Sequence, residues 1–387
     1  MTRWIDDLAP SLAQRHADNL YRRRNNVASA QGPVLTIDDH QYINFSSNDY
    51  LGLANHPAVV YSFQEAATRF GVGAGASHLV VGHQQAHHDL EQALADFTGR
   101  ERAVVFSTGY MANLGVISAL LSKHDTVIQD KLNHASLIDG ARLSDANFLR
   151  YRHNDLDHLQ QQLEKVADDT RVLLAVDGVF SMDGDMPPLN QLASICNRHG
   201  AALMVDDAHG FGWLGDSGAG VSDYFNLGQE RLPILMGTLG KAIGVAGAFV
   251  AGSEALIESL IQYSRSYIYT TALPPACAVA AQQSLKIIAE EPQRRAHLQA
   301  LIDYFQTNSA HLNYKFLAST SAIQALIVGD NARALLLSEQ LRNRGILVSA
   351  IRPPTVAVGS ARLRITLTAA HTFAQVDQLI QTLEEYQ

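Results

Sequence analysis

The ten residues Ala-Ala-Leu-Met-Val-Asp-Asp-Ala-His-Gly, at Ala201–Gly210, determine how this chain is interpreted. Their apolar first half is typical of a buried strand, which delivers two aspartates to the C-terminal end of that strand. A second run, Leu232–Lys241, repeats the pattern, because a short apolar strand is followed by Thr-Leu-Gly-Lys. Isolated charges are costly to bury. An aspartate and a lysine at the ends of two interior strands therefore predict a ligand that pairs with both.

Pyridoxal 5'-phosphate (PLP) meets this requirement, since a lysine forms a Schiff base with its aldehyde and an aspartate keeps its ring nitrogen protonated. The alternation of side chains along a strand places Asp206 on the same face as Met204 and Asp207 on the opposite face. We therefore expect Asp206 to contact the ring nitrogen and Asp207 to pack within the loop. Lys241 is the predicted Schiff-base lysine. The sequence predicts a PLP enzyme.

The phosphate of PLP also has candidate contacts. Backbone N–H groups at a helix N-terminus that follows a strand suit a phosphate best. Gly109 and Tyr110 lie at such a junction, between an apolar run at 103–106 and a helical pattern at 110–121, and Thr238 adds a hydroxyl. Taken alone, a plain strand-to-helix turn explains this junction equally well.

The ring of PLP has three further candidate contacts. His209 and Ser181 each follow a predicted strand and can hydrogen-bond to the ring hydroxyl. His134 follows another strand and can stack on the ring while donating to a substrate carboxylate. Considered one at a time, these residues are more often structural, so it is their combination that favours a cofactor site.

Composition limits the class of protein. The 387 residues are 47% hydrophobic and 17% charged, which is typical of a globular enzyme. The net charge of -9, without a long basic tract, argues against a nucleic-acid partner. Cys196 and Cys277 lack disulfide or metal-ligand spacing, and the first seven residues contain no secretory apolar core. With no apolar stretch of about 18 residues, we expect a cytoplasmic enzyme without a membrane partner.

The order of elements predicts an α/β fold. Short β runs alternate with helical patterns, which indicates a mostly parallel sheet of the seven-stranded type flanked by helices. The predicted strands are 103–106, 126–129, 172–176, 202–206, 234–236 and 248–251. We expect three parts: an N-terminal helix (Ile5–Arg24) and hairpin within residues 1–56, a large PLP-binding domain at 57–289, and a small α+β domain at 290–387.

Other motifs are weaker. Gly240-Lys241 is followed by Ala242, which does not fit a phosphate-binding P-loop. His83, His87 and His88 are close in sequence, but no set of carboxylates or cysteines completes a metal site, so they are interpreted as a solvated helix face. We expect no metal site in this chain.

The assembled motifs resemble those of the α-oxoamine synthases, which are fold-type I PLP enzymes. The matching segments extend over nearly the whole chain: Asn44–Leu53, Asn133–Ser136, Gly178–Asp185, Val205–Gly210, Thr238–Lys241 and Arg362–Thr366. As a set these segments are very specific. Enzymes of this family condense an amino acid with an acyl thioester and release carbon dioxide.

The resemblance implies a role for each matching residue. The implied catalytic residues are Lys241, His134, Asp206 and His209. The implied cofactor contacts are Lys241, His134, Asp206, His209, Gly109, Tyr110, Ser181 and Thr238, with Thr270 or Thr271 reaching the phosphate in the neighbouring subunit of a homodimer. The implied substrate contacts are Arg364 for the amino-acid carboxylate, Arg22 and Thr355 for the acyl group, and Asn48 and His134 within the site.

Within the family, the chain is most similar to the member that joins L-alanine to a pimeloyl thioester in biotin biosynthesis. The compact N-terminus with Arg22–Arg24 and the stretch Ala350–Val356 support this interpretation. A glycine C-acetyltransferase, or less favourably an aminotransferase, is the alternative. The glycine-rich loop, which faces the substrates in this family, departs from the usual family pattern at Gly73–His78.

Overall fold

The computed structural model describes residues 4–167 and 169–387. The chain forms two compact units. One, called here the large unit, comprises Asn48–Ser181 and Asp185–His297; the other, the small unit, comprises the chain up to Ser47 together with Met182–Gly184 and Leu298–Gln387. The predicted three-part division stays a prediction. The predicted N-terminal part begins at residue 1, and its residues 1–3 lie outside the described residues.

The core of the large unit is a seven-stranded sheet with the strand order β3-β9-β8-β7-β6-β4-β5. Only β9 pairs antiparallel with its neighbours among these strands. This confirms the predicted mostly parallel α/β sheet, with one strand added that the sequence analysis did not name, β5. The strands are β3 Arg102–Phe106, β4 Thr126–Asp130, β5 Asn147–Tyr151, β6 Val172–Asp177, β7 Ala202–Asp206, β8 Ile234–Thr238 and β9 Ala248–Gly252.

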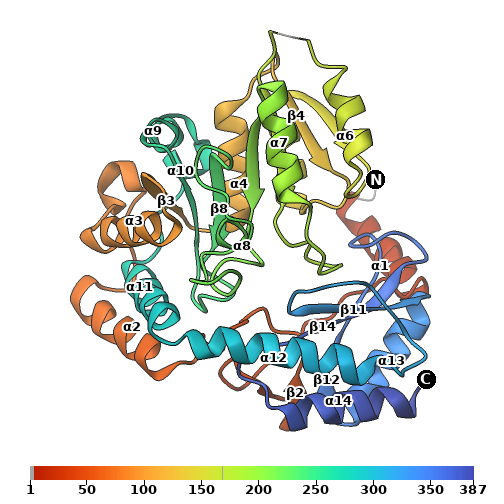
Figure 1. Cartoon of the computed structure of the whole chain (residues 1–387). Coiled ribbons are helices and arrows are strands. Elements are labelled where there is room, and N and C mark those ends of the chain that lie inside the picture. Colours follow the sequence, from red (N-terminus) through yellow and green to blue (C-terminus); the bar gives the residue numbers. More distant parts are fainter. Residues whose placement is uncertain (1–3, 168) are drawn as a thin grey trace. The chain divides into compact units, whose positions relative to one another are not determined.

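Helices cover both faces of this sheet, and Figure 1 shows α4 and α7 on opposite sides of it. One face packs against α4, α5 and α9 in a continuous apolar cluster that includes Met204 and Met236. The helices of the large unit are α2 Pro57–Phe70, α3 Gln85–Thr98, α4 Gly109–Leu120, α5 Ala135–Leu143, α6 Leu156–Leu163, α7 Leu189–His199, α8 Val221–Tyr224, α9 Glu254–Tyr263, α10 Arg265–Ile268 and α11 Pro275–Glu290, with a π-helical turn, η2, at His78–Gly82. Among the described residues, no helix combines the length and apolar character needed to cross a membrane.

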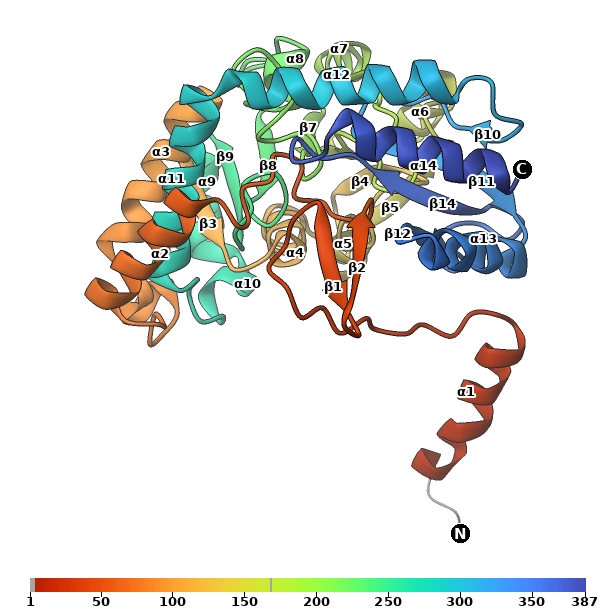
Figure 2. The same ribbon diagram turned by 90° about the horizontal axis from the view of Figure 1, so that it is seen from below.

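The small unit contains the predicted hairpin. Strands β1 (Val34–Ile37) and β2 (His40–Asn44) are antiparallel, and Asp38 and Asp39 between them have φ angles of 49° and 62°. Such a left-handed pair closes a tight hairpin turn. β12 pairs in parallel with β2, so this N-terminal hairpin and a C-terminal strand share a sheet, and Figure 2 shows the two lying together.

A second sheet of the small unit has the order β10-β11-β14-β13. Its strands alternate with helices in the α+β order that the sequence predicts. The bounds are α12 Pro292–Ser309, which begins in the large unit, β10 Lys315–Phe316, β11 Ile323–Gly329, α13 Asn331–Asn343, β12 Ile346–Leu347, β13 Ser349–Ile351, β14 Ala361–Thr366 and α14 Phe373–Glu385.

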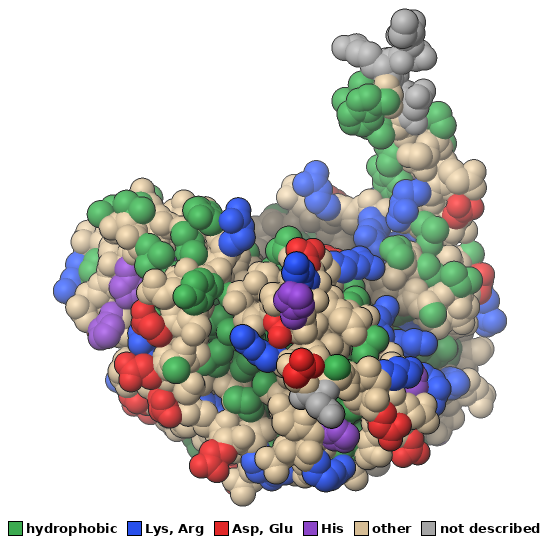
Figure 3. All heavy atoms as spheres, turned by 90° about the horizontal axis from the view of Figure 1, so that it is seen from above, with side chains coloured by type: hydrophobic (Ala, Val, Ile, Leu, Met, Phe, Trp, Pro, Cys, Tyr) green, Lys and Arg blue, Asp and Glu red, His purple; other side chains and the backbone are tan. Residues whose placement is uncertain are grey.

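The N-terminal helix is shorter than predicted. After a 3-10 turn at Trp4–Asp7, α1 spans Leu8–Ala17 and does not continue to Arg24. Asn19 has a φ of 56°, a left-handed conformation that ends a helix. The helix buries none of its residues, and Figure 3 shows hydrophobic side chains exposed along it.

Candidate active site

A pocket of about 190 Å³ lies in the large unit at the C-terminal ends of β6, β7 and β8. This is the edge of a parallel sheet at which α/β proteins bind ligands. Eight of the predicted site residues line it together: Gly109, Tyr110, His134, Ser181, Asp206, His209, Thr238 and Lys241. The remaining lining residues are Asn113, Ser136, Asp177, Val179, Ala208 and Met236.

A chain of polar side chains ends at Lys241. Its Nζ lies 2.8 Å from His209 Nε2, and His209 Nδ1 lies 2.6 Å from the hydroxyl of Tyr50. Tyr50 is 1% exposed, and its hydroxyl donates to Asn48 Oδ1 at 3.4 Å. Because the Tyr50 hydroxyl proton points to Asn48, the Tyr50 oxygen accepts from Nδ1–H of His209. Nε2 of His209 then accepts from the Lys241 ammonium. The ring of His209 is thereby fixed with a lone pair toward Lys241.

Asp206 enters the pocket from the end of β7. One carboxylate oxygen accepts from the side-chain amide of Asn113 at 2.6 Å, and the other accepts from the backbone N–H of Ala208 at 3.0 Å. These bonds fix the direction of the carboxylate. The neighbouring Asp207 does not line the pocket; it is fully buried and accepts the backbone N–H of Val221, as expected for a packing residue.

Asp177 is a second carboxyl group beside Asp206, because the two residues pair in register on β6 and β7. Burial raises the pKa of Asp177 well above its ordinary value, and the charge of Asp206 raises it further. Its Oδ2 accepts the backbone N–H of His134, while Oδ1 has no hydrogen-bond partner within the described part of the chain. Burial and the neighbouring charge both favour the neutral form of the Asp177 carboxyl.

His134 is the N-terminal cap of α5. Its Nδ1 lies 2.6 Å from the hydroxyl of Ser136, which in turn accepts from Asn113 at 2.8 Å. Burial lowers the pKa of His134, and the charge of Asp206 opposes this effect. The result is an imidazole that is held in orientation by its neighbours on one wall of the pocket.

The start of α4 offers a place for an anion such as a phosphate. Gly109 and Tyr110 line the pocket at the first turn of this twelve-residue helix, where backbone N–H groups are unpaired within the helix. The hydroxyl of Thr238 donates to the Gly247 carbonyl at 3.1 Å and accepts from Gly240 N–H at 3.3 Å. A strand, a glycine and a helix N-terminus together form a phosphate-binding arrangement.

The other predicted residues do not line this pocket. Thr270 and Thr271 follow α10, where the backbone carbonyl of Thr271 accepts from Ser107 at 3.0 Å. Arg22, Thr355 and Arg364 belong to the small unit. There, Arg22 donates to Thr355 Oγ1 at 3.0 Å, and Arg364, at the centre of β14, donates to Thr366 Oγ1 at 2.9 Å.

Sequence reasoning did not single out Asn113, Asp177, Ser136 or Tyr50. A signal existed for two of them. Asn113 is a polar residue in an apolar helix, one turn after the predicted phosphate loop, and Asp177 ends a strand next to the one that carries Asp206. Tyr50 lies 159 residues before His209, so only the fold brings the two together.

Comparison with known proteins agrees with this geometry. A family model described as aminotransferase class I and II matches residues 40–383. An "8-amino-7-oxononanoate synthase" of Stutzerimonas stutzeri is 57% identical over 98% of this chain and 96% of its own length. This chain belongs to the 8-amino-7-oxononanoate synthases of the class I and II aminotransferase family.

Solved structures agree with this family assignment. A serine palmitoyltransferase variant from S. paucimobilis with bound PLP matches with a TM-score of 0.93 and 30% identity, over 98% of this chain and 96% of that one. A Francisella tularensis 8-amino-7-oxononanoate synthase matches with a TM-score of 0.77 and 34% identity, over 89% and 97%. The fold is therefore that of the fold-type I PLP enzymes.

The residues of the synthase pocket fit PLP. The pocket places an amine, a carboxylate and a helix N-terminus around one hollow, and these are the partners of an aldehyde, a protonated ring nitrogen and a phosphate. The unpartnered Oδ1 of Asp177 marks a polar wall next to Asp206 that the protein alone leaves unsatisfied. Lys241, Asp206, Thr238 and the first turn of α4 would hold the cofactor.

Proposed function

We propose that this chain condenses L-alanine with a pimeloyl thioester, on coenzyme A or a carrier protein, to give 8-amino-7-oxononanoate, the free thiol and carbon dioxide in biotin biosynthesis. The observation that carries the proposal is the convergence of Lys241, His209, Asp206 and His134 on one pocket in a chain 57% identical to a synthase of this name.

Bound PLP supplies an electron sink that stabilises negative charge at the Cα atom of the amino acid. Asp206 provides the anion that keeps the ring nitrogen protonated, and Asn113 orients that carboxylate. The neutral Asp177 packs beside it without adding a second negative charge. Only one carboxylate therefore pairs with the ring, which is the balance that a monocationic pyridine needs.

Lys241 Nζ acts as the base that takes the Cα proton of the amino acid. A positioned proton acceptor contributes about 10²–10⁴-fold to a rate. His209 lies within hydrogen-bond distance of this nitrogen and is itself fixed by Tyr50. His134 would stack on the ring of bound PLP, and His134 or Lys241 returns a proton to the product after carbon dioxide is lost.

Four further residues are assigned to the substrates. We assign Arg364 to the amino-acid carboxylate, because an arginine fork pairs with a carboxylate in two hydrogen bonds. Arg22 and Thr355 are assigned to the acyl chain, and their mutual hydrogen bond supports a shared role. Asn48 is assigned to the site through its contact with Tyr50.

The proposal includes a cytoplasmic homodimer with shared sites. Exposed apolar side chains support association, among them Leu79, Val80 and Val81, which are 51%, 71% and 70% exposed. They follow Ser77, whose backbone forms a bridge with Thr271. This location supports Thr270 or Thr271 as the residue that reaches the phosphate of a partner. Two free cysteines are consistent with a reducing compartment.

A substrate panel tests the proposed function. Glycine, L-alanine and L-serine are each combined with acetyl, succinyl, pimeloyl and palmitoyl thioesters, and carbon dioxide release is measured. We expect the highest kcat/KM for alanine with the pimeloyl thioester. Highest activity for glycine with acetyl-CoA would instead assign the chain to glycine C-acetyltransferase, and amino transfer to a keto acid without carbon dioxide would assign it to the aminotransferases.

A further inference from the structure

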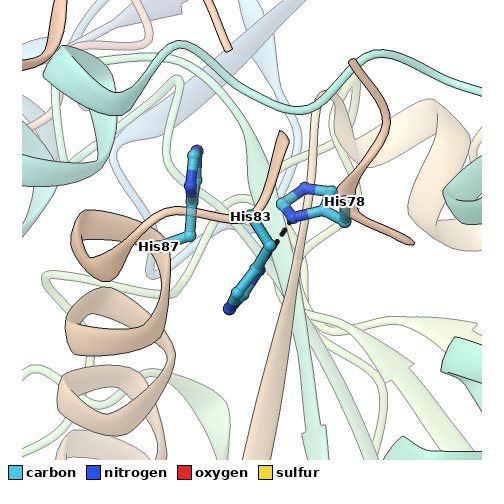
Figure 4. A group of neighbouring side chains, drawn as sticks. All are labelled: His78, His83 and His87. Carbon is cyan, nitrogen blue, oxygen red and sulfur yellow. Dashed lines mark hydrogen bonds between the residues drawn. The ribbon is translucent and has the colours of Figure 1, made fainter. Parts of the chain in front are cut away.

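Three histidines outside the catalytic pocket converge in the large unit. One nitrogen from each of His78, His83 and His87 lies within 4.8 Å of the other two. Figure 4 shows the three side chains close together, with His87 on the first turn of α3 and a hydrogen bond between His78 and His83. The two Nδ1 atoms of that bond are 3.0 Å apart. The interpretation of this region as a solvated helix face is wrong for His87, which is fully buried.

The spacing suits a metal ion. Two nitrogens bound to a tetrahedral zinc at about 2.0–2.1 Å are about 3.3 Å from each other. The Nδ1 atoms of His78 and His83 are already close to that separation. His78 is 7% exposed, and its Nε2 has no hydrogen-bond partner among the described residues. Nε2 can therefore carry the proton of the neutral ring, which leaves the lone pair of His78 Nδ1 on the side of the other two imidazoles.

The surroundings orient the ring of His87 as a metal-binding histidine requires. Such histidines usually donate their second N–H to a carbonyl or carboxylate. His87 Nε2–H donates to the Leu273 carbonyl at 2.6 Å, which leaves the lone pair on Nδ1. In His83, Nδ1 is the nitrogen that faces His78, and Nε2 lies 3.9 Å from the Glu91 carboxylate. The ring of His78 is held by stacking on Tyr267, with 4.8 Å between centroids.

The protonation state of the cluster favours a cation. Burial lowers the pKa of His78 to about 3, and burial also lowers the pKa of His83 and His87. Neutral imidazoles are the form that binds metals. The Glu91 carboxyl group lies beside the cluster, 3.9 Å from His83 Nε2. His83 is 32% exposed, which leaves an entry path for the ion.

We propose that His78, His83 and His87 bind one divalent transition-metal ion, with zinc as the preferred occupant. The ion links the π-helical turn at His78–Gly82 to α3 and so stabilises the loop that carries the altered glycine-rich segment. Binding replaces the hydrogen bond from Gln84 N–H to His87 Nδ1, which is 3.0 Å long. Because that bond must be given up, we expect affinity below that of a closed structural zinc site.

Calorimetric titration of the tag-free, metal-free holoenzyme with zinc tests the proposal. We expect one saturable site per chain at micromolar zinc and a rise in the thermal unfolding midpoint. His83→Ala should weaken that site by at least about tenfold and remove the rise. His88→Ala is the matched control, since His88 is on the same helix turn but outside the cluster, and it should bind like the wild type.

His83 is the ligand chosen for replacement because it is partly exposed. Replacing the buried His78 with alanine could prevent folding, whereas His83→Ala still tests the site. Zinc-edge X-ray absorption of the one-equivalent complex should show imidazole scattering. An anomalous peak in crystals should lie between the three histidines. Absence of a saturable site, or a site that His83→Ala leaves unchanged because zinc sits at Lys241 or the cofactor, overturns the proposal.

Discussion

The catalytic pocket and the histidine cluster both place imidazoles in the interior of the large unit, and they differ in the charges that surround them. In the pocket, His209 lies 2.8 Å from the Lys241 amine, and His134 is close to the carboxylate of Asp206. In the cluster, burial lowers the pKa of His78, and the two neighbouring histidines lower it further. The same residue type is therefore assigned to a charged organic cofactor in one place and to a cation in the other. Neighbouring charge decides the chemistry of a buried histidine.

The largest effect is expected for Lys241→Ala, which removes the only amine of the pocket lining. Loss of its proton transfer alone lowers kcat by about 10²–10⁴-fold, and the covalent attachment of PLP is lost as well. The yellow absorbance of the purified protein and the release of carbon dioxide measure the two losses. Lys286→Ala, on an exposed helix position, is the control. Retained turnover in Lys241→Ala contradicts the assignment.

Asp206 and Asp177 offer a matched pair for the next effect. Asp206→Asn removes the charged partner of the ring nitrogen, worth about 1.5–3 kcal/mol, or about 10- to 150-fold in kcat/KM. Asp177→Asn replaces a group that burial already keeps neutral, so a change below about threefold is expected. Steady-state kinetics of the two variants compare them directly. Equal losses would show that the charge is shared by both carboxyls.

A smaller effect is expected for Tyr50→Phe, which deletes only the hydroxyl that fixes His209. A hydrogen bond of this kind contributes about 0.5–1.5 kcal/mol, so kcat should fall about 2- to 12-fold. The measurement is kcat and its pH profile, because a freed His209 changes how the site titrates, whereas a packing defect does not. An unchanged pH profile together with lowered stability would show that Tyr50 only packs in the core and does not position His209.

The smallest effect is expected on the pH dependence of stability, and it comes from His153, a histidine that two carboxylates surround. Burial lowers the pKa of His153, but hydrogen bonds to Asp130 and Asp185 outweigh this and raise it to about 10. A raised pKa means that the folded state holds a proton that the unfolded state releases. The stabilisation is therefore complete below about pH 6.5 and declines up to about pH 10.

Urea unfolding at several pH values measures this dependence. His153→Asn should flatten the decline between pH 6.5 and 10 that the wild type shows. His124→Asn, at an exposed position, should retain it. If both variants lose stability in parallel with the wild type across this window, His153 is not the group responsible.

Most of the large unit could be predicted because its strands are short apolar runs and its helices have clear periods. Six of the seven strands of its sheet were expected within a few residues of their observed bounds. Strand β5 was missed because Asn147–Tyr151 is only partly buried and contains Asn and Arg, which weakens the apolar signal. The N-terminal helix was overextended because its period continues past Asn19, whose backbone conformation the period does not report.

The sequence by itself determined the cofactor chemistry of this protein, because strand alternation and strand ends dictate where Asp206, His209 and Lys241 emerge. Tertiary structure alone decided the relations between distant segments. It brought Tyr50 to His209, raised the pKa of Asp177 by burying it beside Asp206, and turned three histidines of a loop and a helix into one cluster. The physical reason is that hydrogen bonds, burial and charge act over a few ångströms in space, a distance that separation along the chain does not specify.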